Sequence, residues 1–276
     1  MRGERLTLIQ KQEILNETET AQFRDFSLAS TQIVENDSAT KEQLDFDIVI
    51  ANNLERRKQC CQLAFEEYLK KGYVAHSDKP YIATKYDLVS DSIIFAVRNE
   101  FKEVVGTLTI IPDSPVKLPS DLVFGSELDE LRNQNIKLFE FSRLAIRNDM
   151  KNQFDLLASL INYGGLYANY FLKSDMGIIE VNPHHSGFYE KLLLSKRLTD
   201  VRPSPFVSDA PAILLSLPLK EIMENTEKAR DLNANPHLKR TYFPNFFRDH
   251  SIEKIVAYIQ KAKNNITLEE KEFFNL

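Results

Sequence analysis

The stretch that decides the fold is Leu-Phe-Glu-Phe-Ser-Arg-Leu-Ala-Ile, residues 138–146. Six of its nine residues are apolar and no Pro or Gly interrupts it, so it is predicted to be a β-strand. Strict alternation places Glu140 and Ser142 on one face, and Arg143 on the other face with the two phenylalanines. Polar groups inside a buried strand cost free energy unless each has a partner or a function. Two interpretations remain open at this point: a satisfied buried Glu–Arg network, or a functional site.

The composition argues against several classes of protein. The chain has 276 residues, of which 43% are hydrophobic and 27% charged, enough for a sizeable core. The net charge of −5 argues against a nucleic-acid-binding protein with a broad basic face. The two cysteines, Cys60 and Cys61, are adjacent in a helical pattern, which predicts a reducing cytoplasm and neither a disulfide framework nor a metal site. The longest apolar runs are too short to span a bilayer, so membrane contact is expected to be peripheral at most.

Strands and helices alternate along the middle of the chain. Strands are predicted at residues 46–51, 92–98, 104–111, 138–146, 177–182 and 211–217, and helices at 53–72, 127–133, from Asn152 onwards, 186–194, 219–232, 251–263 and from Thr267. Asn53 and Asn152 are predicted to cap the helices that follow them, and Thr267 and Glu270 to form a capping box. The glycine pair at 164–165 predicts close packing of its helix against another backbone, or a bend. This order predicts an α/β domain over residues 45–220, with a mixed central sheet flanked by helices. Residues 1–44 are polar and are predicted to form an N-terminal arm, with a helix at 17–29. Residues 221–276 are predicted to form a C-terminal helical extension.

Four local motifs give this domain a family resemblance. They are Glu-Phe-Ser-Arg-Leu at 140–144, Val-Gly-Thr-Leu-Thr at 105–109, Asn-Pro-His-His-Ser-Gly-Phe-Tyr at 182–189, and Tyr-Ile-Ala-Thr-Lys-Tyr-Asp at 81–87. In their order along the chain they resemble elements of the N-acyl amino acid synthases, which are related to the acyl-homoserine lactone synthases and have the GNAT acyltransferase fold. The similarity covers residues 45–217. It implies a GNAT-like sheet and transfer of an acyl group.

One departure from the wider GNAT pattern concerns the donor. Acetyl-CoA enzymes of this fold have a glycine-rich turn whose backbone N–H groups hold the pyrophosphate. Here the equivalent turn, residues 147–152, contains no glycine. The resemblance therefore implies an acyl-phosphopantetheine thioester on acyl carrier protein as the donor, rather than acyl-CoA, with no bound cofactor. Arg147 and Lys151 are the predicted donor-binding residues, and a solvated charged turn is the alternative.

The resemblance also assigns chemical roles. Glu140 is the predicted general base that deprotonates the acceptor amine. Tyr189 is either the acid for the leaving thiolate or a packed aromatic on a short helix. Arg143 either binds the acceptor carboxylate or orients Glu140 and Asp87. Burial raises the pKa of Glu140 and a close Arg143 lowers it, so the sequence leaves the net direction open. The other predicted substrate-binding residues, each of which also has an ordinary structural explanation, are Ser142, Asp87, Thr107, Thr109, His184 and His185.

These assignments predict an N-acyltransferase that moves a long-chain fatty acyl group from acyl carrier protein to the amine of an amino acid. The enzymatic alternative is an acyl-homoserine lactone synthase. Its family has an N-terminal Arg/Phe/Trp set, whereas this chain contains no Trp. A CoA-dependent acetyltransferase lacks support because the glycine turn is missing. A third alternative is a non-catalytic acyl- or signal-binding module of the same fold, against which the presence of Glu140 and Arg143 argues.

Overall fold

The computed structural model describes residues 46–231, 233, 235–247, 249–262 and 266–274. These residues belong to one compact unit. The predicted N-terminal arm, with its helix at 17–29, lies outside the described residues.

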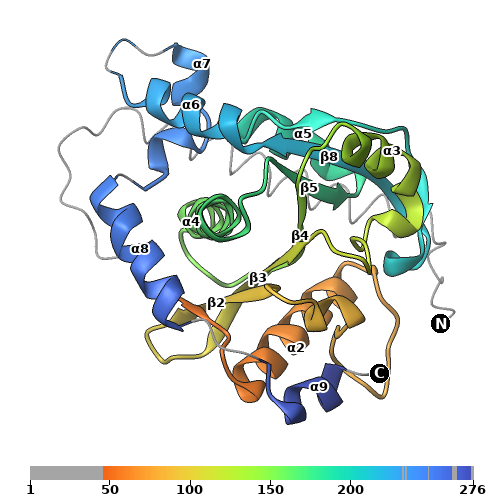
Figure 1. Ribbon diagram of the computed structural model, residues 1–276. Coiled ribbons are helices and arrows are strands. Elements are labelled where there is room, and N and C mark those ends of the chain that lie inside the picture. Colours follow the sequence, from red (N-terminus) through yellow and green to blue (C-terminus); the bar gives the residue numbers. More distant parts are fainter. Residues whose placement is uncertain (1–45, 232, 234, 248, 263–265, 275–276) are drawn as a thin grey trace, which may run out of the picture. The chain divides into compact units, whose positions relative to one another are not determined.

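A mixed sheet of eight strands forms the centre of this unit (Figure 1). Its order is β1-β2-β3-β4-β5-β8-β6, and β7 also pairs with β8. The pair β4–β5 is parallel, while all other described pairs are antiparallel. The strands are β1 (Phe46–Ile50), β2 (Ile93–Asn99), β3 (Val104–Pro112), β4 (Leu138–Ile146), β5 (Met176–Val181), β6 (Lys196–Arg197), β7 (Arg202–Ser204) and β8 (Ala210–Pro218). The predicted α/β class with a mixed sheet is confirmed, and β6 and β7 were not predicted.

Helices cover both faces of the sheet, with α2 and α4 on opposite sides of β3 (Figure 1). The helices are α2 (Leu54–Lys70), α3 (Asp121–Asn133), α4 (Gln153–Tyr167), α5 (Pro183–Leu192), α6 (Leu219–Ala229), α7 (Pro236–Lys239), α8 (Asp249–Ala262) and α9 (Leu268–Phe274), with a short 3₁₀ turn η2 (Lys85–Leu88). Helix α3 begins six residues before its predicted start at 127. Among the described residues, no helix combines the length and apolar character needed to cross a membrane.

Helix α2 begins and ends where the sequence predicts. The Asn53 side chain accepts a hydrogen bond from the backbone N–H of Arg56 at 2.9 Å, so it caps the helix. Gly72 follows the helix with φ of 71°, a conformation that glycine adopts without strain. Cys60 and Cys61 of α2 are buried free thiols, and burial raises the pKa of Cys60 to about 11.

Helix α4 packs against the sheet face opposite α2, and its glycine pair, Gly164 and Gly165, lies at the point of contact. A Cβ atom on Gly164 would lie 2.7 Å from Ile110 Cδ1 and 2.8 Å from Phe141 Cε1, so the helix packs closely there, against side chains of the sheet and not against another backbone. Gly165 has no such neighbour. The prediction that Asn152 caps this helix is wrong, because its backbone is left-handed (φ 56°) and its side chain makes no cap bond. One π-helical turn, Ala168–Leu172, extends the helix.

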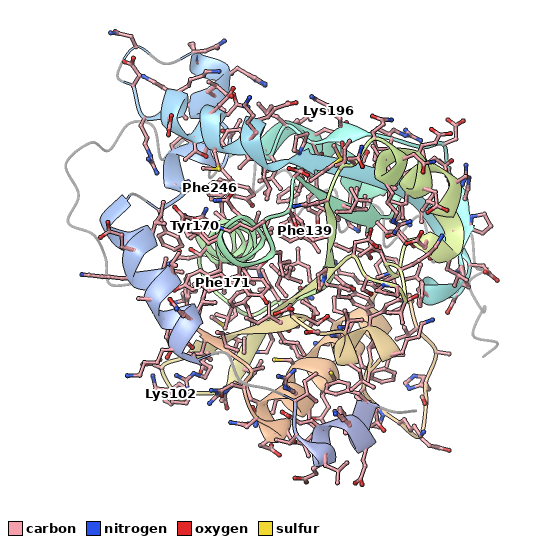
Figure 2. All side chains as sticks on the ribbon, in the orientation of Figure 1. Lys102, Phe139, Tyr170, Phe171, Lys196 and Phe246 are labelled. Atoms are coloured by element: carbon pink, nitrogen blue, oxygen red, sulfur yellow. The ribbon has the colours of Figure 1, made fainter. Side chains whose placement is uncertain are left out.

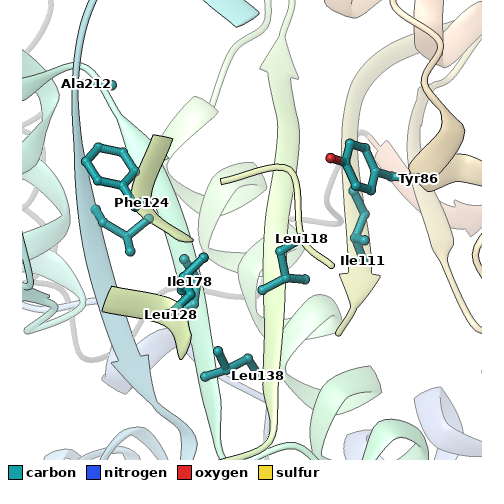
Figure 3. Packing of buried hydrophobic residues seen from close by; sticks show 9 residues of the cluster. Tyr86, Ile111, Leu118, Phe124, Leu128, Leu138, Ile178 and Ala212 are labelled. Carbon is teal, nitrogen blue, oxygen red and sulfur yellow. The ribbon is translucent and has the colours of Figure 1, made fainter. Parts of the chain in front are cut away.

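Two apolar clusters fill the face that carries α2 and α3. Figure 3 shows the larger one, which joins Tyr86, Ile111, Leu118, Phe124, Leu128, Leu138, Ile178, Ala212 and Leu214. On the α4 face Phe139 and Phe141 pack together with ring centroids 4.9 Å apart, and Phe139 is labelled beside α4 in Figure 2. Phe95, Phe139 and Phe141 are buried side chains of this core.

The helices that follow β8 pack back onto the sheet. The Tyr258 hydroxyl of α8 accepts a hydrogen bond from the Ile50 backbone N–H at 2.9 Å. From α9, Glu270 forms an ion pair with Arg57 at 2.9 Å, and Phe274 joins the second apolar cluster. The predicted capping box is confirmed, because Thr267 N–H donates to Glu270 and Glu270 N–H donates to Thr267.

Candidate active site

A bulge in β4 decides where the two charged residues of the central strand lie. Thr107 lies opposite Ala145 and Thr109 opposite Ser142, so β4 has one extra residue between these pairs. Arg143 occupies the bulge with φ of 49°. Its side chain consequently contacts the α2 face and not the α4 face of Phe139 and Phe141. The face predicted for Arg143 by strict alternation is therefore wrong.

Arg143 and Asp87 form a buried ion pair. Both terminal nitrogens of the guanidinium donate to the Asp87 carboxylate. They also donate to the Ile82 carbonyl and the Thr109 hydroxyl, each at 2.9 Å. Asp87 in turn accepts from the backbone N–H of Thr84 at 2.8 Å. Arg143 thus holds the loop of residues 82–87 against β3 and β4, which favours the orienting role over binding of an acceptor carboxylate.

Glu140 lies on the same face but outside that network. One oxygen of its buried carboxyl accepts a hydrogen bond from the Ser120 backbone N–H at 3.0 Å. Burial raises the pKa of Glu140 to about 8, and the Ser120 N–H offsets this only in part. The net direction that the sequence left open is therefore upward. A carboxyl with a pKa close to neutral can accept and release a proton under ordinary conditions.

The sheet opens beside Glu140. Strands β4 and β5 pair only over Leu138–Glu140 and Met176–Ile178. Beyond Glu140, no described strand pairs with this edge of β4, whose Ser142 and Leu144 are half-buried. Backbone N–H and C=O groups at an unpaired edge can bind an extended ligand that carries amide groups.

Other predicted residues lie on elements around this opening. Thr109 bonds to Arg143, and Thr107 lies beside the Cys60 thiol. Both threonines are buried under α2. His184 and His185 are in the first turn of α5, directly after β5. Burial lowers the pKa of His185 to about 4, and its Nε2 is 2.9 Å from the Tyr73 hydroxyl.

Tyr189 lies one turn further along α5. Burial is the main cause that raises its pKa above the usual range, and the nearby Tyr68 adds to this. The phenol is therefore protonated at neutral pH. Burial is also the main cause that raises the pKa of Tyr68, on α2, to about 12, and the carboxyls of Glu180 and Glu140 add to it.

The two predicted donor-binding residues are in the turn before α4. Arg147 donates to Asp149 at 2.6 Å and also to Glu103 at 3.3 Å. Lys151 is exposed. The turn has a left-handed Asn152 and no glycine, so it does not form the close-approach loop that a pyrophosphate needs.

Sequence reasoning missed three neighbours of Glu140: Ser120, Glu180 and Tyr68. Glu180 carried a usable signal, because it is a carboxylate within the apolar strand Met176–Val181, the same feature that singled out Glu140. Ser120 is in a loop and Tyr68 in a helical apolar pattern, so neither residue stood out.

The fold is GNAT-like, and the match to a protein family supports an N-acyltransferase. Residues 59–218 match the model of the family described as N-acyl amino acid synthase FeeM. This match covers more than half of the chain, and the protein belongs to that family. No curated protein matches the chain.

Solved structures share the fold. FeeM, an N-acyl amino acid synthase from uncultured soil microbes, is 23% identical with a TM-score of 0.56, and the match covers 64% of this chain and 91% of FeeM. The AHL synthase LasI is 15% identical with a TM-score of 0.47, over 63% of this chain and 89% of LasI. A putative N-acetyltransferase from Lactobacillus plantarum is 12% identical with a TM-score of 0.44, over 63% of this chain and 98% of that one. At 23% identity the likeness to FeeM shows a shared fold alone.

Proposed function

We propose that the protein transfers a long-chain fatty acyl group from acyl carrier protein to the amine of an amino acid. The observation that carries this proposal is the position of Glu140. It is a buried carboxyl with a hydrogen bond from Ser120, at the point where β4 and β5 separate. Membership of the N-acyl amino acid synthase family supports an amino acid as the acceptor.

Glu140 is the general base of the proposed reaction. An amino acid carries its amine as an ammonium ion at neutral pH, and the ammonium form cannot attack a thioester. A carboxylate with a pKa of about 8 is basic enough to accept that proton and is still substantially ionised slightly above neutral pH. Arg143 does not take part in this step, because Asp87, Ile82 and Thr109 engage its guanidinium.

The separated edge of β4 is the proposed place of the thioester. A phosphopantetheine arm contains two amide groups, which can pair with the free backbone groups beyond Glu140. Backbone N–H groups there can also stabilise the oxyanion of the tetrahedral intermediate. The protonated phenol of Tyr189 then supplies a proton to the leaving thiolate.

The turn before α4 is the proposed place of the donor phosphate. An acyl carrier protein presents one phosphodiester, which needs cations and not a glycine-rich loop. Lys151 is exposed and can meet this phosphate directly. Arg147 can join it by exchanging its contacts with Asp149 and Glu103, which are exposed carboxylates and are held weakly.

A turnover assay with two donors tests this proposal. Purified full-length protein is mixed with palmitoyl-acyl carrier protein or with palmitoyl-CoA, together with a pool of the twenty amino acids, and the products are identified by mass spectrometry. An N-palmitoyl amino acid is expected with the carrier donor. Product from palmitoyl-CoA alone would contradict the proposed donor, and no product from either donor would contradict the proposed reaction.

A further inference from the structure

A second carboxyl, which the mechanism above does not use, lies beside Glu140. Glu140 is opposite Ile178 in the parallel pair, and Glu180 is two residues further along β5. Alternate residues of a strand share a face, so Glu180 is a diagonal neighbour of Glu140 on the same face of the sheet. The opening between β4 and β5 begins between these two residues.

Two buried hydroxyl groups adjoin the carboxyls and lack partners. Ser120 donates its backbone N–H to Glu140 at 3.0 Å, and the hydroxyls of Ser120 and Ser204 are near enough to Glu180 to lower its pKa. Both serines are 0% exposed. The two hydroxyls act on the carboxyl pKa values as weak donors, but neither oxygen lies within hydrogen-bonding distance of a described group. Buried polar groups are nearly always satisfied, so unpaired hydroxyls beside carboxyl groups indicate that a hydrogen-bonding ligand belongs there.

The charged and titratable groups around Glu140 supply no cation for the pair. Asp121 of α3 is acidic, while Tyr86 of η2 and Tyr68 of α2 are neutral phenols at ordinary pH. Arg143 of the same strand is paired with Asp87. Within the described part of the chain, neither Glu140 nor Glu180 forms an ion pair. Burial raises the pKa of both carboxyls, and each adjacent acid adds to the cost of ionising Glu140.

We propose that Glu140 and Glu180 together bind the acceptor's amino group as an ammonium ion, with the hydroxyls of Ser120 and Ser204 as additional acceptors. A primary ammonium has three N–H donors, and this site offers two carboxyl groups and two free hydroxyl oxygens to receive them. The cation also offsets the repulsion between the buried Glu140 carboxylate and the half-buried Glu180 carboxylate. This inference rests on the proposed function, because it assigns the acceptor subsite of the same reaction.

Glu140 and Tyr189 carry the protons of the proposed reaction. Glu140 takes one proton from the bound ammonium, and Glu180 remains ionised beside the protonated Glu140. The neutral amine attacks the thioester carbon, so a C–N bond forms and the C–S bond breaks. The thiolate gains a proton from the Tyr189 phenol. The attacking nitrogen loses its second proton, and this proton restores the phenol of Tyr189. Glu140 then releases its proton to solvent.

Binding of simple amines tests the subsite without any acyl transfer. Glutamate carboxyl carbons labelled with ¹³C are followed by NMR during titration with n-butylammonium chloride, and tetramethylammonium, which has no N–H donor, is the matched ligand control. The Glu140 and Glu180 signals are expected to shift together with n-butylammonium and not with tetramethylammonium. Glu180→Gln is expected to abolish the response, and Glu221→Gln, which removes an exposed carboxylate paired with Lys196, to preserve it. An n-butylammonium response that survives Glu180→Gln would overturn the proposal.

Kinetics separate this subsite from a structural role. Glu180→Gln is expected to raise the KM for the acceptor roughly 10- to 100-fold, the loss expected for one hydrogen bond between charged groups, with the donor KM unchanged. Removing the acidic Glu180 is also expected to lower the pKa of Glu140, so the decrease of kcat/KM at low pH should begin at a lower pH. Ser204→Ala is a second variant. It is expected to raise the acceptor KM without loss of stability, because it removes an unpaired buried hydroxyl.

The inference would be overturned if a folded Glu180→Gln protein formed product with an unchanged acceptor KM and an unchanged pH profile. The proposed function would remain intact. Specific n-butylammonium binding in a protein that forms no acylated amino acid would instead contradict the proposed function alone.

Discussion

Asp87→Asn should destabilise the protein severely, because it leaves the buried Arg143 without its counter-charge. The two side chains are 7% and 0% exposed. Removing one partner of a buried ion pair costs about 3–5 kcal/mol. The asparagine keeps the volume, but its amide nitrogen faces donors, either Arg143 or the N–H and hydroxyl groups of Thr84. The loss is a large part of the roughly 5–15 kcal/mol that stabilises a typical domain.

Urea unfolding followed by circular dichroism measures this loss as a shift of the midpoint at constant slope. Asp47→Asn is the matched control, since it breaks the Arg98–Asp47 pair, whose side chains are 21% and 39% exposed. That variant is expected to lose at most about 1 kcal/mol. Adding Arg143→Met to Asp87→Asn should restore part of the stability, because the uncompensated charge is then gone. A cost of Asp87→Asn no greater than that of Asp47→Asn would show that burial adds nothing to the Arg143–Asp87 ion pair.

Three further predictions follow from Glu140 and the glycine pair of α4. The kcat/KM for the acceptor should fall about tenfold per pH unit below pH 8, because Glu140 must be ionised to act. If Glu140→Gln shows the same decrease of kcat/KM at low pH, the decrease belongs to another group. The free energy of unfolding should decrease as pH rises from about 4 to about 8, because folded Glu140 keeps a proton that the unfolded chain releases, and Glu140→Gln should remove this contribution in pH-dependent urea titrations. Gly164→Ala should destabilise the protein by about 1–3 kcal/mol, because the added methyl group crowds Ile110 and Phe141. Gly165→Ala has open space around it and should stabilise the protein by up to about 1 kcal/mol. Equal shifts of the melting temperature in the two variants would contradict this packing.

The sequence predicted the ends of β4 because its apolar pattern is continuous. It could not predict the face of Arg143. Alternation assumes one residue per step, and the bulge depends on a left-handed backbone at a residue that is not glycine. The contact with Asp87, 56 positions earlier in the chain, holds the side chain on that face. Long-range contacts of this kind are absent from local periodicity.

The pKa of Glu140 shows the same limit. From sequence, the adjacent Arg143 could have lowered it, and the direction depended on whether the two side chains meet. The structure places Arg143 with Asp87 and Glu140 with Ser120, so burial decides. Glu180 could have been found, since a carboxylate in a buried strand is visible in the sequence. Its proximity to Glu140 depends on the register of β4 and β5.

The role of Glu140 as the general base is tested most directly by following the acyl group in the wild type and in Glu140→Gln. Each protein is mixed with palmitoyl-acyl carrier protein and the preferred amino acid, and the N-palmitoyl product is quantified by mass spectrometry, with carrier binding measured separately. Glu140→Gln is expected to bind the acylated carrier as the wild type does but to form product about 10²–10⁴-fold more slowly, the range for loss of a general base. A variant that binds the carrier normally and forms product at the wild-type rate would contradict the assignment of Glu140 as the base.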